Sequence, residues 1–436
     1  MKPANAALLL GLLLLPGLAL AQAAPPAASA PRRTIRLDEA VASARAHQPQ
    51  LRQAQAQARA ADARTRESRA ALLPQLSLSG GVGLGTSNVA GRPTSSTVQG
   101  SWSGTAAVDQ VLFDAQALES YRAAGATASA SRATERAAEL DVDSGVRAAY
   151  FAARAQRDLV TVAQETVKND EAHLRQVQGF VDVGTQPAIA LAQTRSQLAS
   201  ARLQLIQADN AYASARSQLL QAMGEPGSLD FDVADDTLPA VPGEEGAVDP
   251  LVEEAIAARP ELASLLEQRR AEQLTRSAAR GGYLPSVSAR ASGTEFGSRP
   301  LDPSRGNVEN WTAGINLSWS LFDGGLTRAR VQEAQANLDA IQAQEDALRL
   351  SIRVAVEQAT LGVRAASASV AAADDALTSA REQLRLAEGR YQAGAGSIIE
   401  LGDAQVAAST AAATRVQAAY NLAAARAALL RALGRR

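Results

Sequence analysis

The chain has no cysteine and has little histidine, aromatic side chain or excess charge of either sign. With no cysteine among 436 residues, disulfides, thiolate nucleophiles and cysteine-ligated metal or iron–sulfur centres are excluded. The two histidines, His47 and His173, are far apart in the sequence, which argues against histidine-based catalysis or metal binding. The 43 basic and 45 acidic residues nearly balance and form no basic cluster, so nothing indicates nucleic-acid binding. We therefore expect no enzyme, no cofactor and no bound metal.

Large apolar side chains are scarce, and alanine takes their place. Aromatic residues make up 3% of the chain, yet 46% of it is hydrophobic, because 98 residues are alanine. Compact cores need Leu, Ile, Val and Phe, whereas a chain rich in Ala, Arg, Glu and Leu is typical of long helices packed through small side chains. The composition favours a mainly helical protein.

Long apolar runs are also missing, except at the N-terminus. Met1 and Lys2 precede an apolar stretch over residues 6–20, and small residues around Ala21 follow it. This order predicts a secretory signal peptide over residues 1–21, cut after Ala21 or Ala23. The alternative, a membrane anchor, needs about 20 apolar residues without a proline. We expect residues 22–36 to form a flexible lead.

The rest of the chain is a tandem duplication. The segments HQPQL at 47–51 and ARPEL at 258–262 match at an offset of 211, as do LLPQLSLSG at 72–80 and YLPSVSARA at 283–291. The segments VLFD at 111–114 and SLFD at 320–323 match at 209, and LLQAMG at 219–224 matches LLRALG at 429–434 at 210. Four matches in the same order at nearly one offset predict two copies of a unit of about 210 residues.

In each copy the residue pattern changes from helical to alternating and then back to helical. These changes set the expected boundaries of the elements. The first copy, 37–224, has helices over 37–73, strands at 75–85 and 101–113, a long helix at 115–180, a tip at 181–187 and a return helix at 188–223. The second copy, 251–434, has helices over 251–281, strands at 284–295 and 311–322, a long helix at 325–391, a tip at 392–397 and a return helix at 398–433. Residues 225–250 form an acidic linker.

The four predicted strands alternate apolar with small or polar residues over about ten positions. This pattern is what a transmembrane β-barrel strand needs, with lipid on one face and water on the other. A soluble sandwich is the alternative, but four strands supply no second sheet to cover the apolar face. We expect Trp102, Trp311 and Trp319 to be aromatic residues at the membrane interface. Because a closed barrel takes about eight strands, the barrel must be shared between subunits.

The long helices carry a strict seven-residue apolar repeat, which indicates left-handed supercoiled packing. In the first copy the matching positions are apolar except Gln156 and Asp170. In the second copy all twelve positions are apolar: Ile352, Val356, Ala359, Val363, Ala366, Val370, Ala373, Leu377, Ala380, Leu384, Ala387 and Tyr391. A helix of about 65 residues is roughly 98 Å long, more than a globular domain requires.

Glycines mark the ends of both outgoing helices. We expect Gly184 and Gly394 to be left-handed caps where the chain reverses. After the second reversal, Ser397 and Glu400 have the spacing of a capping box that starts the return helix.

The order of these elements, which occurs once in each copy, resembles that of the TolC family of outer-membrane efflux proteins. The segments that carry the resemblance are LLPQLSLSG at 72–80, LSWSLFDGG at 317–325 and RYQAGAGSIIELGDAQ at 390–405. The resemblance implies a homotrimer in the outer membrane of a Gram-negative bacterium, with a 12-stranded barrel in outer-membrane lipid continued by a periplasmic α-helical barrel. It also implies a periplasmic adaptor and an inner-membrane pump, of the RND or ABC type, as partners in tripartite efflux or type I secretion. Drugs, metals and proteins all remain candidate cargoes.

The resemblance also implies a gate at the reversal tips. Glu400 and Asp403 match the two acids that ring the pore, and Tyr391 matches the tip aromatic. Gly394, Ser397, Gly184 and Thr185 complete the predicted tips. The alternatives are a capping role for Glu400, which is compatible with the ring, and a solvated helix face for Asp403.

The chain departs from the family pattern at both tips. Ala190 stands where the family usually has an acid, and Gly396 stands where TolC has a basic residue, so we expect the gate to be held differently.

Two other classes of protein are weighed against the export channel. A periplasmic adaptor would have one helical hairpin flanked by a split β-domain. A soluble coiled-coil scaffold would have no use for a signal peptide or for strand pairs.

Overall fold

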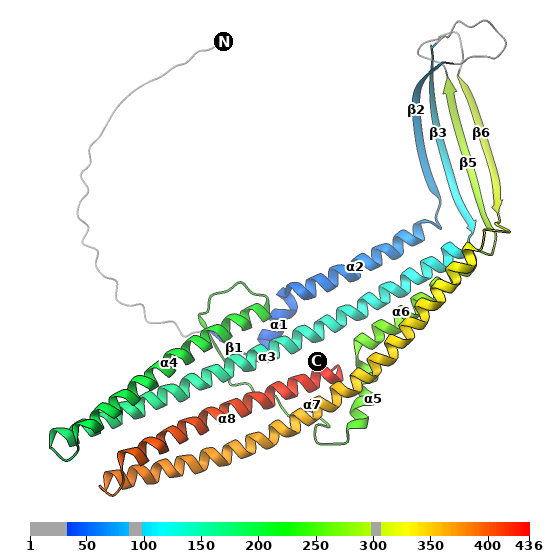
Figure 1. Cartoon of the computed structure of the whole chain (residues 1–436). Helices are drawn as coiled ribbons and strands as arrows, with labels where there is room; N and C mark the ends of the chain where they lie inside the picture. The colour runs from blue at the N-terminus through cyan, green and yellow to red at the C-terminus, as the bar shows by residue number, and fades with distance from the viewer. Residues whose placement is uncertain (1–32, 87–97, 298–306) are drawn as a thin grey trace, which may run out of the picture.

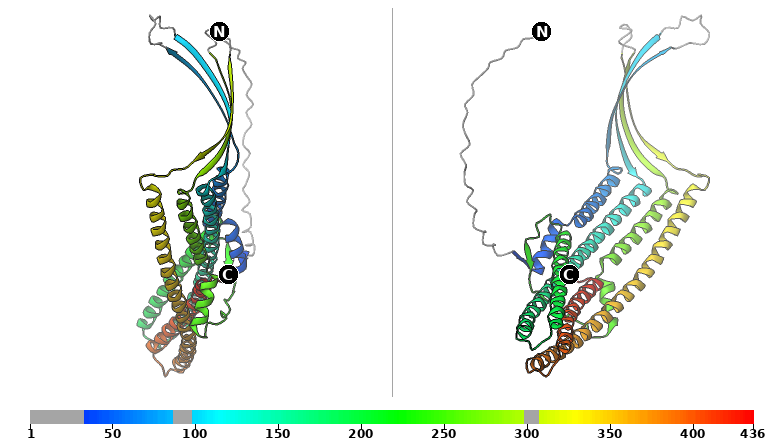
Figure 2. Two further views of the ribbon diagram at one scale, coloured as in Figure 1. Left: turned by 90° about the vertical axis from the view of Figure 1, so that its right-hand side faces the viewer. Right: turned by 60° about the vertical axis from the view of Figure 1, so that its left-hand side comes forward.

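The computed structural model describes residues 33–86, 98–297 and 307–436, and in it long helices run side by side and carry a sheet at one end (Figure 1). The predicted signal peptide, residues 1–21, lies outside the described residues, as does most of the predicted lead. The two views of Figure 2 show the sheet twisting as it leaves the helical part. The molecule is therefore elongated, with helices over most of its length and the sheet at one end.

The secondary structure confirms the duplication, because each element of the first copy begins 210 or 211 residues before its counterpart. The first copy consists of α1 (Leu37–His47), α2 (Pro49–Ala70), β2 (Gln75–Thr86), β3 (Val98–Phe113), α3 (Ala115–Asp182) and α4 (Ala188–Met223). The second consists of α5 (Val248–Ala258), α6 (Pro260–Gly281), β5 (Ser286–Gly297), β6 (Val308–Ser318), α7 (Leu326–Gln392) and α8 (Ile398–Leu433).

Two long hairpins, α3 with α4 and α7 with α8, dominate the helical part (Figure 1). Helix α3 has 68 residues and is therefore about 102 Å long. The apolar positions of the seven-residue repeat form a seam along each long helix. Seam residues are fully buried, as the repeat predicts; examples are Val146, Ala153, Ile352, Val356 and Val363. No helix among the described residues has an apolar stretch long enough to cross a membrane. Two hairpins also argue against the adaptor alternative, which has one.

The predicted helical segments 37–73 and 251–281 are each interrupted by a proline. Gln48 and Arg259 adopt extended backbone before Pro49 and Pro260, because proline disfavours helical backbone in the preceding residue. The second segment also begins earlier than expected, since α5 starts at Val248, inside the predicted linker. Each copy thus has a short helix, α1 or α5, that packs against a long hairpin before the proline turns the chain into α2 or α6.

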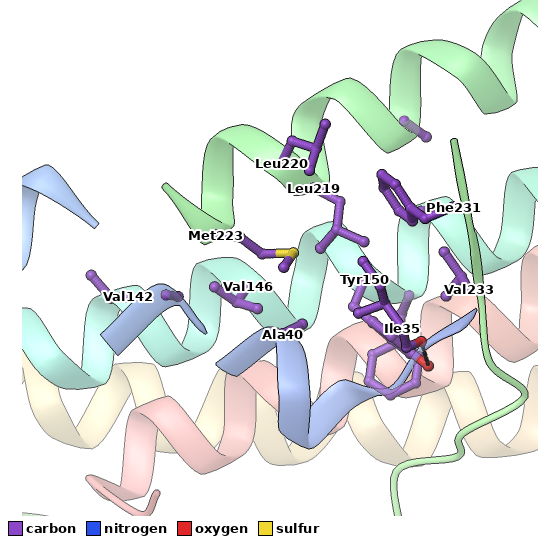
Figure 3. Close-up of a cluster of buried hydrophobic side chains, with 14 of the residues drawn as sticks. Ile35, Ala40, Val142, Val146, Tyr150, Leu219, Leu220, Met223, Phe231 and Val233 are labelled. Atoms are coloured by element: carbon purple, nitrogen blue, oxygen red, sulfur yellow. Dashed lines mark hydrogen bonds between the residues drawn. The ribbon is translucent and has the colours of Figure 1, made fainter. Parts of the chain in front are cut away.

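Part of the predicted flexible lead is ordered, which corrects the expectation for residues 22–36. Strand β1 (Arg33–Ile35) pairs in parallel with β4 (Phe231–Val233), which lies in the predicted linker. Ile35, Phe231 and Val233 are buried with Tyr150 between α1, α3 and α4 (Figure 3). The Tyr150 hydroxyl donates to a carboxylate oxygen of Asp236, 3.1 Å away. This core forms because two distant segments each supply a short apolar strand.

The sheet is antiparallel in the order β2-β3-β5-β6, so the strands of the two copies join at β3 and β5. The register places Leu76, Leu78 and Val82 on the face that also carries Ile315 and Leu317. These five side chains are all strongly exposed, and Leu78 is 84% exposed. On the other face the hydroxyls of Ser292 and Thr312 are 2.8 Å apart, and those of Thr105 and Thr294 are 3.1 Å apart. One face is therefore apolar and uncovered, and the other is polar.

The last strand is shorter than the predicted range 311–322, since β6 ends at Ser318. Trp319 and Leu321 continue the apolar alternation but lie in the connection to α7. There Gly324 and Gly325 have φ values of 69° and 90°, and Asp323 accepts hydrogen bonds from the backbone of Gly325 and Thr327. The turn that begins α7 ends the strand, although the residue pattern does not change.

The return helices of the two copies end in equivalent glycine caps whose surroundings differ. Substitution of each glycine therefore compares how tightly the two helix ends are packed. Gly224 and Gly434 have φ values of 71° and 72°. A Cβ atom at Gly224 would lie 2.8 Å from backbone atoms of Gln48, whereas at Gly434 the nearest atom, in Ala258, would be 3.3 Å away.

We expect Gly434→Ala to lower the free energy of unfolding by about 1–2 kcal/mol through left-handed strain alone. Gly224→Ala should lower it by clearly more, because the methyl group also overlaps the α1–α2 junction. Thermal unfolding of the two purified variants compares them directly. Equal losses would show that this close approach does not constrain the fold.

Candidate functional site

The first tip joins α3 to α4 through residues 183–187, a shorter turn than the predicted 181–187. Gly184 has φ 74°, as predicted for a left-handed cap. The backbone N–H and the hydroxyl of Thr185 both donate to the carbonyl of Phe180, each at 2.9 Å. Thr185 therefore closes the turn through both its backbone and its side chain, and α4 begins directly after Pro187.

The second tip, residues 393–397, is built in the same way around Gly394, whose φ is 72°. The backbone N–H groups of Ala395 and Gly396 donate to the carbonyl of Arg390, at 2.9 and 3.0 Å. A Cβ atom at position 396 would lie 3.0 Å from the backbone nitrogen of Tyr391. The tight turn thus accounts for glycine at this position, where the family resemblance led us to look for a basic side chain.

Ser397 caps α8, and Glu400 is held by a different partner from the predicted one. The Ser397 hydroxyl accepts a hydrogen bond from the backbone N–H of Glu400 at 3.1 Å, which confirms half of the capping box. The Glu400 carboxylate pairs with the guanidinium of Arg390, with an N–O distance of 2.9 Å. Arg390 lies at the end of α7, so this ion pair spans the turn.

The two predicted gate acids lie one turn apart at the start of α8. Residues three apart face the same side of a helix, so Glu400 and Asp403 can present their carboxylates together. Glu400 is half-buried and Asp403 is exposed. In the single chain the exposure of Asp403 fits both a pore ring and a solvated helix face.

Tyr391 joins the two hairpins. Its side chain is 4% exposed, and its ring centre lies 5.5 Å from that of His173 and 6.1 Å from that of Phe180, both on α3. Ala190 is 2% exposed and belongs to the same apolar cluster, with Val177, Ala387, Leu401 and Ala404. The alanine that replaces the expected acid at position 190 therefore fills the contact between the tips.

His173 and Arg390 are site residues that sequence reasoning did not identify. Burial lowers the pKa of His173, which favours the neutral ring against Tyr391. His173 belongs to no local motif, and Arg390 begins the segment 390–405 without a role that spacing would reveal. The contacts of His173 depend on the second hairpin, and those of Arg390 depend on the folded turn. Within the described residues, no cluster of three His, Asp or Glu side chains could hold a metal ion.

The predicted interface tryptophans lie at the sheet, far from the tips. Trp102 pairs in register with Val82, toward the loop end of β3, and Trp311 is near the start of β6. Trp319 lies beyond the other end of β6, where its indole N–H donates to the carbonyl of Tyr283 at 3.1 Å. Trp311 is 79% exposed. The three residues thus lie near the two ends of the sheet, and their place at the membrane interfaces stays a prediction.

The Tyr391 contact gives a matched pair of substitutions. Tyr391→Ala should leave a cavity between the tips and cost about 3–5 kcal/mol of local stability. Tyr391→Phe should change stability by less than about 1 kcal/mol, since the hydroxyl has no partner among the described residues. Amide hydrogen exchange at both tips measures the difference. If Phe loosens the tips as much as Ala, the hydroxyl and not the ring holds them together.

Comparison with known proteins agrees with this architecture. The pyoverdine export outer membrane protein OpmQ of Pseudomonas aeruginosa is 26% identical over 302 residues, 69% of this chain and 63% of that protein. Protein CyaE of Bordetella pertussis is 28% identical over 393 residues, 84% of this chain and 77% of that protein. The chain spans 38% of the length of outer membrane protein OprJ of P. aeruginosa, so several curated relatives are matched over less than two thirds of their length.

The fold is shared with solved outer-membrane channels. The Campylobacter jejuni CmeC outer membrane channel superposes with a TM-score of 0.79 at 19% identity, over 91% of this chain and 85% of that chain. The open state of the Neisseria gonorrhoeae MtrE outer membrane channel gives 0.73 at 21% identity, over 92% and 89%. The family model for outer membrane efflux proteins matches residues 40–225 and 251–435, one stretch in each copy. The chain therefore belongs to the outer membrane efflux protein family.

Proposed function

We propose that this protein is the outer-membrane exit duct of a tripartite efflux pump or type I secretion system. Three copies, each supplying four strands, would close a 12-stranded barrel, and the hairpins would continue it as a helical tunnel through the periplasm. The observation that carries the proposal is the four-stranded sheet with one uncovered apolar face, set on two long hairpins. A single chain has too few strands to close a barrel.

The two faces of the sheet suit lipid and water, respectively. Apolar side chains such as Leu78, Val82 and Ile315 would meet lipid on the outside of the barrel. The polar face, with its paired Ser and Thr hydroxyls and an ion pair between Asp109 and Arg290 at 3.4 Å, would line the water-filled interior. This arrangement satisfies the polar groups without burying them in hydrocarbon.

The tips would meet the rest of the export system. Val183, Ile189 and Ile399 are large apolar side chains exposed at or beside the two turns. Exposed apolar groups at the periplasmic end would contact a periplasmic adaptor, which connects the duct to an inner-membrane pump of the RND or ABC type. The cargo, a small molecule or a protein, would then be chosen by the pump.

Glu400 and Asp403 would form the charged constriction of the periplasmic gate. Three copies bring three carboxylates of each residue to one ring, and rings of acids select cations. Arg390 offsets the charge of Glu400 in each chain, because the two are paired. The ring would therefore be less negative than its acids alone suggest.

We expect Glu400→Ala combined with Asp403→Ala to abolish most of the cation selectivity of the channel and to raise its leak. Removing the carboxylates takes away the negative potential at the narrowest point. The measurement is the reversal potential of the purified trimer in planar bilayers under a salt gradient. Unchanged selectivity would refute the acidic ring.

Two further variants test the acidic ring by the same measurement of reversal potential. Arg390→Gln should increase cation selectivity, because it frees the Glu400 charge without adding a new acid. Asp374→Asn removes an exposed α7 carboxylate that pairs with Arg415 and is absent from the predicted ring, so its selectivity should match that of the unaltered protein. A decrease with Arg390→Gln would show that Arg390 holds the ring in place instead of neutralising it.

A further inference from the structure

The seam between the two hairpins contains a buried carboxylate that neither the packing nor the proposed gate uses. Asp170, on α3, is 3% exposed. It occupies a seam position, and the equivalent residue of the second copy is Ala380. Desolvation by burial raises the pKa of Asp170 above its ordinary value. Within the described part of the chain, no hydrogen bond or ion pair reaches this carboxylate.

The surroundings of Asp170 come from both hairpins. A groove of about 440 Å³ borders it on the side of α4 and α8, and a smaller groove borders it on the side of α7. The neutral polar side chains in these walls are Thr166, Asn169, Gln197, Ser200, Gln204, Gln405, Ser409 and Thr410. The charged side chains lining the same space, among the described residues, are Glu165 on α3 and Arg381 on α7. Arg381 is exposed, and among the described residues it forms no ion pair with Asp170.

Asp170 lies in the contact between the two hairpins. Helix α3 packs against α8 here, and Gln197 on α4 donates a hydrogen bond to Gln405 on α8 at 3.3 Å. Farther toward the tips, Tyr391 of α7 rests on His173, one turn after Asp170 on α3. Asp170 borders two grooves but is only 3% exposed, so separation of the hairpins would hydrate it more fully and stabilise its charged form.

We propose that Asp170 is a proton-controlled latch that sets how readily the two hairpins separate. An ionised carboxylate buried without a partner destabilises the packed seam, whereas a protonated one does not. The raised pKa means that protonation stabilises the packed seam. Asp170 has its lower pKa when the hairpins are separated and its higher pKa when they are packed. The stabilisation is complete at pH values below the lower pKa, and it is lost as the pH rises through the higher one. The latch therefore weakens as the pH rises, and acidification tightens it.

His173 is the titratable neighbour that must be separated from this effect. Burial lowers its pKa, so its protonation would favour separation, which is the opposite direction. His173→Gln removes the titration and keeps a polar side chain at this buried position, whereas the equivalent Gln383 of the second copy is exposed.

The test records the opening frequency of the full-length trimer in planar bilayers, and it rests on the proposed channel function. We expect Asp170→Asn and Asp170→Ala to lower the opening frequency near pH 7.5, because a neutral side chain removes the charge that destabilises the packed seam. Both variants should also lose the decrease in opening that acidification causes in the unaltered protein. Glu171→Gln, which removes a neighbouring carboxylate that pairs with Arg202, is the matched control and should behave as the unaltered protein does.

Two results would overturn the proposal. One is an Asp170→Asn channel with the opening frequency and pH profile of the unaltered protein. The other is a pH profile that survives in Asp170→Asn and disappears in His173→Gln. Opening frequency is independent of the reversal potential, so a failure of the acidic ring and a failure of the latch can be told apart.

Amide hydrogen exchange tests the latch even if no variant conducts. At the same neutral pH, exchange along α8 near Gln405 and Ser409 should be slower in Asp170→Asn than in the unaltered protein. Equal exchange would mean that Asp170 does not control the seam, whereas slower exchange in a protein that never conducts would reject the channel function and keep the latch.

Discussion

The fold depends on apolar surfaces that one chain cannot cover by itself. The sheet has an apolar face and no second sheet, and the helices pack through alanine, which gives narrow seams instead of a thick core. Alanine allows the helical backbones to approach closely, but each seam position buries little area. Long rods of this kind gain stability along their whole length, with additional cores where the short helices and strand β1 fold back onto α3 and α7. The remaining apolar surface fits an assembly with further copies and with lipid.

The duplication gives the molecule two hairpins that are similar in shape and different in chemistry. At equivalent positions the first hairpin has Asp170, His173 and Ala190, and the second has Ala380, Gln383 and Glu400. The first hairpin thus carries buried titratable groups at the contact between the hairpins, whereas the second carries charged groups at the turn. A device that opens by moving one hairpin against the other can use this difference, because the first hairpin contributes a control at the seam and the second contributes one at the turn.

Much of the fold could be predicted from the sequence, because its strongest signals are periodic. The return helices begin and end at the predicted residues, and the seven-residue repeat identifies the buried seam. Other features depend on contacts between distant residues. The pairing of Arg33–Ile35 with Phe231–Val233 joins two three-residue strands that are too short to show alternation. The apolar alternation runs past Ser318, and only the glycine turn at 324 and 325 shows where the strand ends. The pairing of Arg390 with Glu400 follows from the shape of the turn, which residue spacing does not reveal.

The central claim is that three chains complete one another in the outer membrane. The most direct measurement separates outer-membrane and periplasmic fractions and compares heated with unheated samples by gel electrophoresis, with cross-linking to count the subunits. The account predicts a trimer in the outer-membrane fraction that dissociates to single chains only on heating. A monomer in the periplasmic extract would contradict it.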